Sequence, residues 1–249
     1  MDLKDKIAIV TGGATGIGKA CSLALARQGV ALAVNYSRSE ADARETVKEI
    51  VDAGGRAMSV KADVAYDDEV RAMVGAVVRE FGGVDLLVNS AGTTRFIPLS
   101  DLESVTDEIW DDIMAVNVKG IFNCARAVAP HMRERGAGAI VSIASLSGYT
   151  GDGSSLPYAV SKAAAIGLTR SLAKALAPQI RVCSVAPGIV KTRWVAGREH
   201  HVERLSSSAL LQRTATPEDV AAMVIALFTQ DAITGQTIVL DAGQFLGVS

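Results

Sequence analysis

A regular alternation of short apolar runs and longer amphipathic segments limits the fold of this 249-residue chain more than any other feature. Strands that alternate with helices build a parallel sheet, because right-handed crossovers place each helix against one face or the other. We predict strands at 7–11, 31–35, 56–61, 86–89, 139–143, 180–186 and 237–240. We predict helices at 16–28, 40–53, 67–81, 107–135, 157–176 and 217–228, the last with Thr216 as N-cap. The sequence therefore predicts a doubly wound α/β fold of about seven strands.

The composition agrees with a core of small aliphatic side chains in one domain. Hydrophobic residues make up 49% of the chain and aromatic residues only 4%, so Ala, Val, Ile and Leu must pack a sheet that is buried on both faces. No linker or repeat interrupts the pattern, and we predict a single domain over residues 1–249. The stretch 189–211 lacks clean periodicity, so we expect either a substrate lid or an ordinary helical insertion there.

Charge and cysteine content argue against several classes of function. The formal net charge is −2 and no long basic block occurs, so neither nucleic acid nor an anionic membrane is an expected partner. The cysteines lie far apart in apolar patterns, which favours buried reduced thiols, and the histidines form no metal-ligand cluster. The N-terminal segment does not have the layout of a signal peptide, and no apolar run is long enough to span a membrane. We therefore expect a metal-free, soluble, cytoplasmic protein.

A glycine-rich turn follows the first predicted strand and opens the first predicted helix. Residues 11–18 are Thr-Gly-Gly-Ala-Thr-Gly-Ile-Gly. The glycines at 12, 16 and 18 permit a tight turn and let a ligand approach the backbone closely. The start of the helix then offers unpaired N–H groups to a pyrophosphate. The spacing differs from the common G-x-G-x-x-G fingerprint, but its place after a first strand favours a dinucleotide site over a plain loop.

Tyr158 and Lys162 form the second motif. Positions four apart share one face of a helix, so the phenol and the ammonium should lie side by side. A cation near a phenol favours the phenolate, and we expect a lowered Tyr158 pKa and a side chain able to give and take a proton. The alternative is an exposed helical tyrosine with an unrelated lysine.

The two motifs together resemble the short-chain dehydrogenase/reductase family, and the chain is most similar to its 3-oxoacyl-[acyl-carrier-protein] reductase type. The resemblance covers essentially the whole chain and implies a Rossmann-type sheet. Further family marks stand where the resemblance requires them, and one of them departs slightly, since Ser90 replaces the second Asn of Asn-Asn-Ala-Gly. These marks are Asp63-Val64, Asn89-Ser90-Ala91-Gly92, Asn117, Ser145, Pro187-Gly188 and Thr192.

The resemblance implies a catalytic tetrad of Asn117, Ser145, Tyr158 and Lys162. Tyr158 would exchange a proton with the substrate oxygen, and Ser145 would hydrogen-bond the same oxygen. Lys162 would keep the phenol acidic and bind the nicotinamide ribose. Asn117 would orient Lys162 through a water, although it could merely satisfy a helix kink. Ser147 is the rival to Ser145, and the spacing of Ser145 to Tyr158 favours Ser145.

The resemblance also implies the residues that hold the cofactor. The glycine turn would take the pyrophosphate, Asp63 and Val64 the adenine, and the segment from Pro187 to Thr192 the nicotinamide amide. The full set is Gly12, Thr15, Gly16, Ile17, Gly18, Ser37, Arg38, Ser39, Asp63, Val64, Asn89, Ala91, Gly92, Tyr158, Lys162, Pro187, Gly188, Ile189, Val190 and Thr192.

The end of the second strand favours NADP(H) over NAD(H). An NAD site usually carries a carboxylate there to bind the ribose 2′-hydroxyl, and none appears before Glu40. Arg38, with the hydroxyls of Ser37 and Ser39, could hold a 2′-phosphate by charge-assisted hydrogen bonds. The alternative is a solvated arginine, and the family's second basic residue is absent because Thr15 takes its place.

The activity implied is hydride transfer between a nicotinamide and a small-molecule carbonyl or secondary alcohol, with 3-oxoacyl thioester reduction as one candidate. The alternatives are an NAD-dependent sugar, polyol or steroid dehydrogenase of the same family, and a non-catalytic dinucleotide sensor or scaffold. The resemblance implies a homotetramer. Substrate contacts are expected from the lid, from residues 149–156, and from Arg95 and Phe96.

Overall fold

Seven strands form one parallel sheet in the computed structural model of the protein, which describes residues 1–197 and 199–247. The spatial order is β3-β2-β1-β4-β5-β6-β7. The chain therefore builds the sheet outward in opposite directions from β1 and β4, and the strand order reverses between these two strands. This confirms the predicted doubly wound α/β fold. The strands are β1 (Ile7–Thr11), β2 (Ala31–Tyr36), β3 (Ala57–Lys61), β4 (Leu86–Asn89), β5 (Gly138–Ile143), β6 (Ile180–Pro187) and β7 (Thr237–Leu240).

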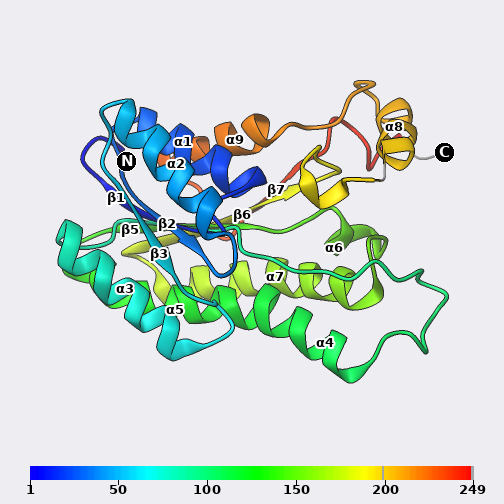
Figure 1. The fold of residues 1–249 in the computed structure, drawn as a ribbon, viewed down its shortest axis with the longest axis horizontal. Coiled ribbons are helices and arrows are strands. Elements are labelled where there is room, and N and C mark those ends of the chain that lie inside the picture. The colour runs from blue at the N-terminus through cyan, green and yellow to red at the C-terminus, as the bar shows by residue number, and fades with distance from the viewer. Residues whose placement is uncertain (198, 248–249) are drawn as a thin grey trace.

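Helices cover both faces of the sheet (Figure 1). On one face lie α1 (Gly16–Arg27), α2 (Glu40–Asp52) and α9 (Pro217–Thr229), and on the other lie α3 (Asp67–Phe81), α4 (Asp107–Met114), α5 (Gly120–Glu134) and α7 (Leu156–Leu176). The short α6 (Ser147–Thr150) and α8 (Glu199–Ser208) lie together at one end of the molecule. That end is where the carboxyl ends of β4, β5 and β6 lead, and it carries the site described below.

The core consists of two apolar layers, one on each side of the sheet. Alternate residues of β1 belong to different layers, with Ile7 and Ile9 on one side and Ala8 and Val10 on the other. This alternation is what a strand buried on both faces requires. The cysteines are buried free thiols, and burial raises the pKa of Cys21 and of Cys124 to about 12. These thiols are therefore poor nucleophiles.

One predicted helix is interrupted. The prediction of a continuous helix over 107–135 is wrong, because a π-helical turn, η1 (Ala115–Lys119), separates α4 from α5. In this turn the Gly120 N–H bonds to the Ala115 carbonyl, five residues back. Such turns often occur at functional sites, and this one contains Asn117.

Two further segments bear on the predictions. Thr216 is the N-cap of α9, as predicted, and its Oγ1 accepts from the Asp219 N–H at 3.1 Å in a capping box. The stretch 189–211 holds a short 3₁₀ turn, η2 (Arg193–Val195), and α8, and Val190 pairs with Ala215 in an isolated bridge. Within the described residues, no helix is both long and apolar enough to cross a membrane.

Candidate active site and nucleotide cleft

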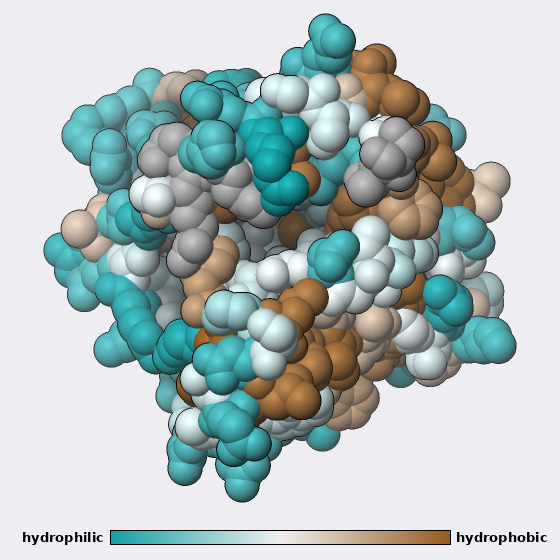
Figure 2. Space-filling view, turned by 90° about the vertical axis from the view of Figure 1, so that its right-hand side faces the viewer, coloured by the Kyte–Doolittle hydropathy of each residue, from teal (hydrophilic) through white to brown (hydrophobic). Residues whose placement is uncertain are grey.

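A cleft of about 1800 Å³ runs along the carboxyl ends of the central strands. Figure 2 views the end of the molecule that carries α6 and α8, where the surface is hollowed and bordered by hydrophobic as well as polar side chains. One part of the cleft is lined by Gly12 to Gly18 and another by Tyr158 and Lys162. All the catalytic and cofactor-binding residues predicted from the sequence line it except Asn89 and Asn117.

The glycine turn has a backbone that other residues rarely adopt. Gly12 and Gly16 have φ values of +59° and +53° in the left-handed region. A Cβ added to Gly18 would lie 2.1 Å from the Gly12 carbonyl oxygen. The first turn of α1 therefore packs closely against the loop before it, and Gly16, Ile17 and Gly18 line the cleft. The start of a helix is a favourable place for a phosphate group.

Two buried polar residues that the sequence reasoning missed hold this turn in place. Thr11 Oγ1 accepts from the backbone N–H groups of Ser90, at 3.0 Å, and of Ala91, at 3.1 Å. Asn35 Oδ1 accepts from the Gly12 N–H at 3.3 Å, and Asn35 Nδ2 donates to the Ala62 carbonyl at 3.0 Å. They join the ends of β1, β2, β3 and β4. The available signal was a polar residue at or near the end of an otherwise apolar strand.

Asn89 lies at the end of β4 behind the cleft wall. Its side chain is buried, and Nδ2 donates to Ser142 Oγ at 3.2 Å. Its Oδ1 has no hydrogen-bond partner within residues 1–197 and 199–247. The following residues Ser90, Ala91 and Gly92 form the wall itself. Asn89 thus supports the wall, and only its neighbours present backbone to a ligand.

Tyr158 and Lys162 lie one turn apart near the start of α7, with Ser145 facing them from the loop after β5. The Ser147 N–H donates to Ser145 Oγ at 3.2 Å, and the Ser145 hydroxyl acts on the Tyr158 phenol by lowering its pKa. Lys162 Nζ lies 5.6 Å from the centroid of the Tyr158 ring and donates to the Ile143 carbonyl at 2.9 Å. Ser145 is therefore the serine that contacts the phenol.

The electrostatics of this pair differ from the expectation. Burial raises the pKa of Tyr158, and the Ser145 hydrogen bond offsets only part of that rise. The predicted lowering of the Tyr158 pKa is wrong for the protein alone, because desolvation of the buried phenol dominates. Burial also lowers the pKa of Lys162 to about 8. Near neutral pH, the phenol is thus protonated and the lysine is charged.

Asn117 connects the π-helical turn to two other elements. Its Oδ1 accepts from the Thr93 N–H at 2.8 Å, and its Nδ2 donates to the Thr93 carbonyl and to Ser161 Oγ, each at 3.0 Å. Ser161 Oγ donates in turn to the Tyr158 carbonyl at 2.7 Å. Asn117 therefore fixes the loop after β4 against the catalytic face of α7. Thr93 and Ser161 were not singled out in the sequence.

The wall beyond β6 is completed by the C-terminal segment. Gln244 Oε1 accepts from the Ile189 N–H at 3.1 Å, and a Cβ on Gly188 would lie 2.7 Å from the same oxygen. Thr192 Oγ1 accepts from the Trp194 N–H at 3.2 Å and caps η2. The Trp194 and Tyr158 ring centroids are 6.1 Å apart. Gln244 was missed because nothing in the sequence links it to a loop 55 residues earlier.

A partly apolar mouth lies next to the phenol. Thr94 Oγ1 and Ser154 Oγ are 2.6 Å apart, which ties the loop after β4 to the loop before α7. Arg95 does not line the cleft, and its guanidinium lies 3.6 Å from Asp112. Within the stretch 189–211, the side chains of Leu210 and Leu211 are exposed and lie outside the cleft. The apolar lining comes from Phe96, Ile97, Leu99, Trp194, Val195, Leu205 and Phe245.

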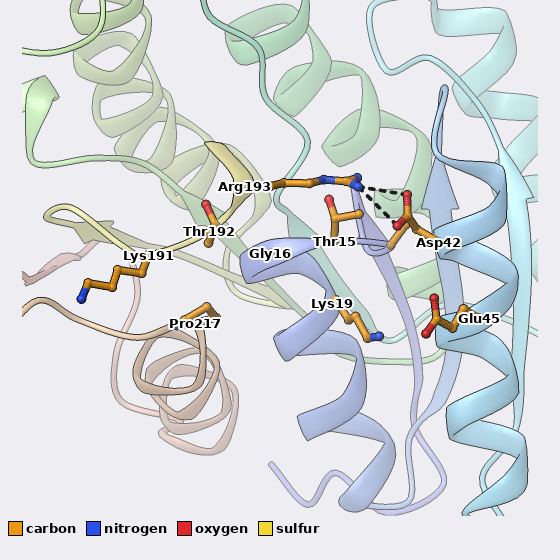
Figure 3. Close-up of a pocket in the computed structure, with 10 residues that line it drawn as sticks. Thr15, Gly16, Lys19, Asp42, Glu45, Lys191, Thr192, Arg193 and Pro217 are labelled. Atoms are coloured by element: carbon orange, nitrogen blue, oxygen red, sulfur yellow. Dashed lines mark hydrogen bonds and ion pairs between the residues drawn. The ribbon is translucent and has the colours of Figure 1, made fainter. Parts of the chain in front are cut away.

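The opposite end of the cleft carries polar and charged groups. Ser37 and Arg38 are exposed there, and Asp63 Oδ1 accepts from the Ala65 N–H at 3.0 Å. Arg193 also reaches this end and lies beside Thr15 (Figure 3). Within the part of the chain that the structure describes, no group of three or more His, Cys, Asp or Glu side chains could hold a metal ion.

The cradle of left-handed glycines at a helix start, at the point where the strand order reverses, fits a dinucleotide. The fold and the cleft thus define a dinucleotide-binding α/β protein with a tyrosine, a lysine and a serine at one end of the cleft. Comparison with known proteins gives the family. The family described as short chain dehydrogenase matches residues 6–203.

Individual relatives are similar to the chain over half or nearly all of its length. The 3-oxoacyl-[acyl-carrier-protein] reductase FabG of Staphylococcus aureus is 39% identical over 245 residues, which cover 97% of this chain and 98% of that protein. The short-chain dehydrogenase/reductase homolog YusR of Bacillus subtilis is 56% identical over 129 residues, covering 52% of this chain and all of that protein. A dehydrogenase/reductase crystal structure from Sinorhizobium meliloti superposes with a TM-score of 0.89 at 33% identity, covering 98% of this chain and 97% of that one.

The chain therefore belongs to the short-chain dehydrogenase/reductase family. It is a nicotinamide-dependent oxidoreductase that acts on carbonyl or alcohol groups.

Proposed function

We propose that this protein reduces the 3-oxo group of acyl thioesters with NADPH, and that Ser145, Tyr158 and Lys162 carry out the chemistry. The observation that carries the proposal is that Ser145, Tyr158 and Lys162 line the same cleft as the glycine turn. The Lys162 ammonium lies 5.6 Å from the centroid of the Tyr158 ring. A proton donor and a nucleotide cradle that share one cleft are what carbonyl reduction requires.

The residues divide the work by their chemistry. When bound, the nicotinamide supplies a hydride to the carbonyl carbon. Tyr158 donates its proton to the carbonyl oxygen, and the Ser145 hydroxyl holds that oxygen as negative charge develops on it. Lys162 stabilises the phenolate left behind, since its charge lies close to the ring. Asn117 positions α7 through Ser161 and the Tyr158 carbonyl, and touches none of the reacting atoms.

The raised pKa of Tyr158 agrees with its proposed role as a proton donor. A phenol whose pKa lies above its ordinary value of 10 is almost fully protonated near neutral pH. In carbonyl reduction it can therefore give its proton to the carbonyl oxygen.

The substrate class rests on the mouth of the cleft and on the relatives. The mouth combines Phe96, Leu99 and Phe245 with the polar Ser154 and Asp152, which suits an apolar chain that carries a polar keto group. The Staphylococcus aureus relative is named for 3-oxoacyl reduction. The preference for NADPH rests on the exposed Arg38 between Ser37 and Ser39 in the cleft, because a guanidinium pairs with a 2′-phosphate and gains little from a hydroxyl.

We also propose a homotetramer and a cytoplasmic location. The exposed Phe122 on α5 and Val160 on α7 support association through these helices. Light scattering coupled to size exclusion measures the mass of the assembly directly.

Turnover is tested by following NADPH oxidation with acetoacetyl thioesters. We expect Tyr158→Phe to lower kcat by about 10²–10⁴-fold, because it loses the proton donor. The matched control is Tyr66→Phe, which removes an exposed phenol next to α3 and should leave kcat unchanged. A Tyr158→Phe rate within tenfold of wild type would refute the assignment of the acid. Reduction of simple ketones with no turnover of any 3-oxoacyl thioester would refute the substrate class.

A further inference from the structure

Arg193 extends from η2, in the loop after β6, to the junction of β2 and α2 (Figure 3). Its Nη2 donates to Ser39 Oγ at 3.1 Å, and its Nη1 lies 3.2 Å from Asp42 Oδ2 and 3.3 Å from Asp42 Oδ1. Residues about 150 positions apart in sequence are thereby joined across the open side of the cleft. The guanidinium lies over the glycine turn, beside Thr15.

This position coincides with the proposed 2′-phosphate site. Ser39 is one of the two hydroxyls that flank Arg38, so a group bonded to Ser39 lies next to any phosphate held there. A 2′-phosphate carries more negative charge than one arginine neutralises. Of the other cations near the turn, Lys19 is paired with Glu49, and Lys191 points away from it (Figure 3). Arg193 is the cation that reaches Ser39.

The present partner of Arg193 is one that a phosphate can replace. The Arg193 side chain is 57% exposed and that of Asp42 is 39% exposed, so the pair is well solvated and weak. A phosphate offers the same planar guanidinium a stronger, bidentate partner. An uncompensated Asp42 would instead repel that phosphate, so Arg193 also shields the site from this carboxylate.

We propose that Arg193 is a cofactor-specificity residue, which supplies the second cation for the 2′-phosphate of NADPH and is held in place by Asp42 until the cofactor binds. The inference rests on the NADPH preference proposed above. It assigns part of the nucleotide selectivity to the lid segment, in addition to the β2–α2 junction.

The test measures binding of nucleotide fragments by calorimetry, because Trp194 lies next to Arg193 and contacts Tyr158, so turnover would mix two effects. The probes are 2′,5′-ADP, which carries the 2′-phosphate, and 5′-AMP, which lacks it. Arg193→Gln should weaken 2′,5′-ADP about tenfold and change 5′-AMP less than twofold. Asp42→Asn should leave 2′,5′-ADP binding unchanged or tighten it, since the competing carboxylate is gone. Arg213→Gln, which breaks another exposed Arg–Asp pair outside the cleft, should alter neither.

Two results overturn the inference alone. One is an equal loss of both probes in Arg193→Gln. The other is a loss of 2′,5′-ADP binding in Asp42→Asn that matches the loss in Arg193→Gln, because the pair would then act only as a structural clasp. If the wild-type protein binds 2′,5′-ADP no tighter than 5′-AMP, the NADPH preference itself is refuted, and this inference with it.

Discussion

Replacing Lys162 with Met should make the protein more stable while it abolishes carbonyl reduction. The Lys162 side chain is only 7% exposed and bears a positive charge at neutral pH. A buried charge is destabilising unless its hydrogen bonds replace the lost hydration. Within the described residues, the ammonium makes a single hydrogen bond, to the Ile143 carbonyl. Met has a similar length and no charge, so it removes the desolvation cost and keeps the packing.

The magnitude follows from the pKa. Burial lowers the pKa of Lys162 from 10.5 to about 8, and at about 1.4 kcal/mol per pH unit the charged side chain costs about 3 kcal/mol of folding free energy at pH 7. Loss of the charged hydrogen bond to the Ile143 carbonyl reduces this gain in stability by about 1.5 kcal/mol. We expect a net gain of about 1–3 kcal/mol, or about 3–9 °C in Tm for a chain of this size.

The gain should depend on pH in a defined direction. Folded Lys162 releases its proton near pH 8 and unfolded Lys162 near 10.5. Between these values the unfolded chain binds more protons, so the Lys162 contribution makes wild-type stability rise with pH. The advantage of Lys162→Met is therefore full below about pH 8 and nearly gone above about 10.5. Thermal unfolding of the cofactor-free wild-type and variant proteins measures the stability difference at pH 7, where it should be full, and at pH 10, where most of it should be lost.

The control is Lys174→Met, which replaces an exposed lysine on the same helix. It should change Tm by no more than about 1 °C at either pH, because no buried charge is removed. A Lys162→Met variant that is less stable than wild type at pH 7, or equally stabilised at both pH values, would show that burial of the ammonium does not destabilise the fold.

Two further predictions concern the cofactor end. Gly18→Ala should destabilise the fold by about 1–3 kcal/mol, because its Cβ would lie 2.1 Å from a backbone oxygen. The control is Gly75→Ala on α3, which should instead stabilise the fold by about 0.5–1 kcal/mol, since its Cβ meets only the end of a flexible arginine side chain. Chemical denaturation measures the unfolding free energy of each variant. Equal effects of the two substitutions would contradict the steric argument. Arg38→Asp should raise the Kd of NADPH at least tenfold more than that of NADH, by fluorescence titration, and equal losses would remove Arg38 from the 2′-phosphate site.

The fold was predictable because its signals are local and repeated. β1, β4, β7 and α3 have the predicted bounds, since each is an apolar or amphipathic run closed by a turn or capping residue. The single helix expected over 107–135 failed because periodicity does not register one extra residue in a turn. The π-helical turn at Asn117 is stabilised by Thr93 and Ser161, which come from two other segments.

The site was less predictable, because it depends on contacts between distant segments. Motif spacing placed Ser145, Tyr158 and Lys162 correctly in one cleft, but it could not show that Lys162 bonds to the Ile143 carbonyl. It also could not show that the Tyr158 phenol is buried, so the predicted direction of its pKa shift was wrong. The sequence did not indicate Arg193 as a nucleotide contact, since only the folded chain brings it to Ser39.

The hydrogen bond between Gln244 and Ile189 affects the order in which the parts of the cleft form during synthesis of the protein. The glycine turn follows β1, whereas the hydrogen bond that fixes Ile189 requires a residue that follows β7. A nascent chain that has folded its early strands can present a nucleotide cradle, yet it lacks part of the wall beside the reacting groups. That wall is completed only after the segment that follows β7 has been made and has folded back onto the loop after β6.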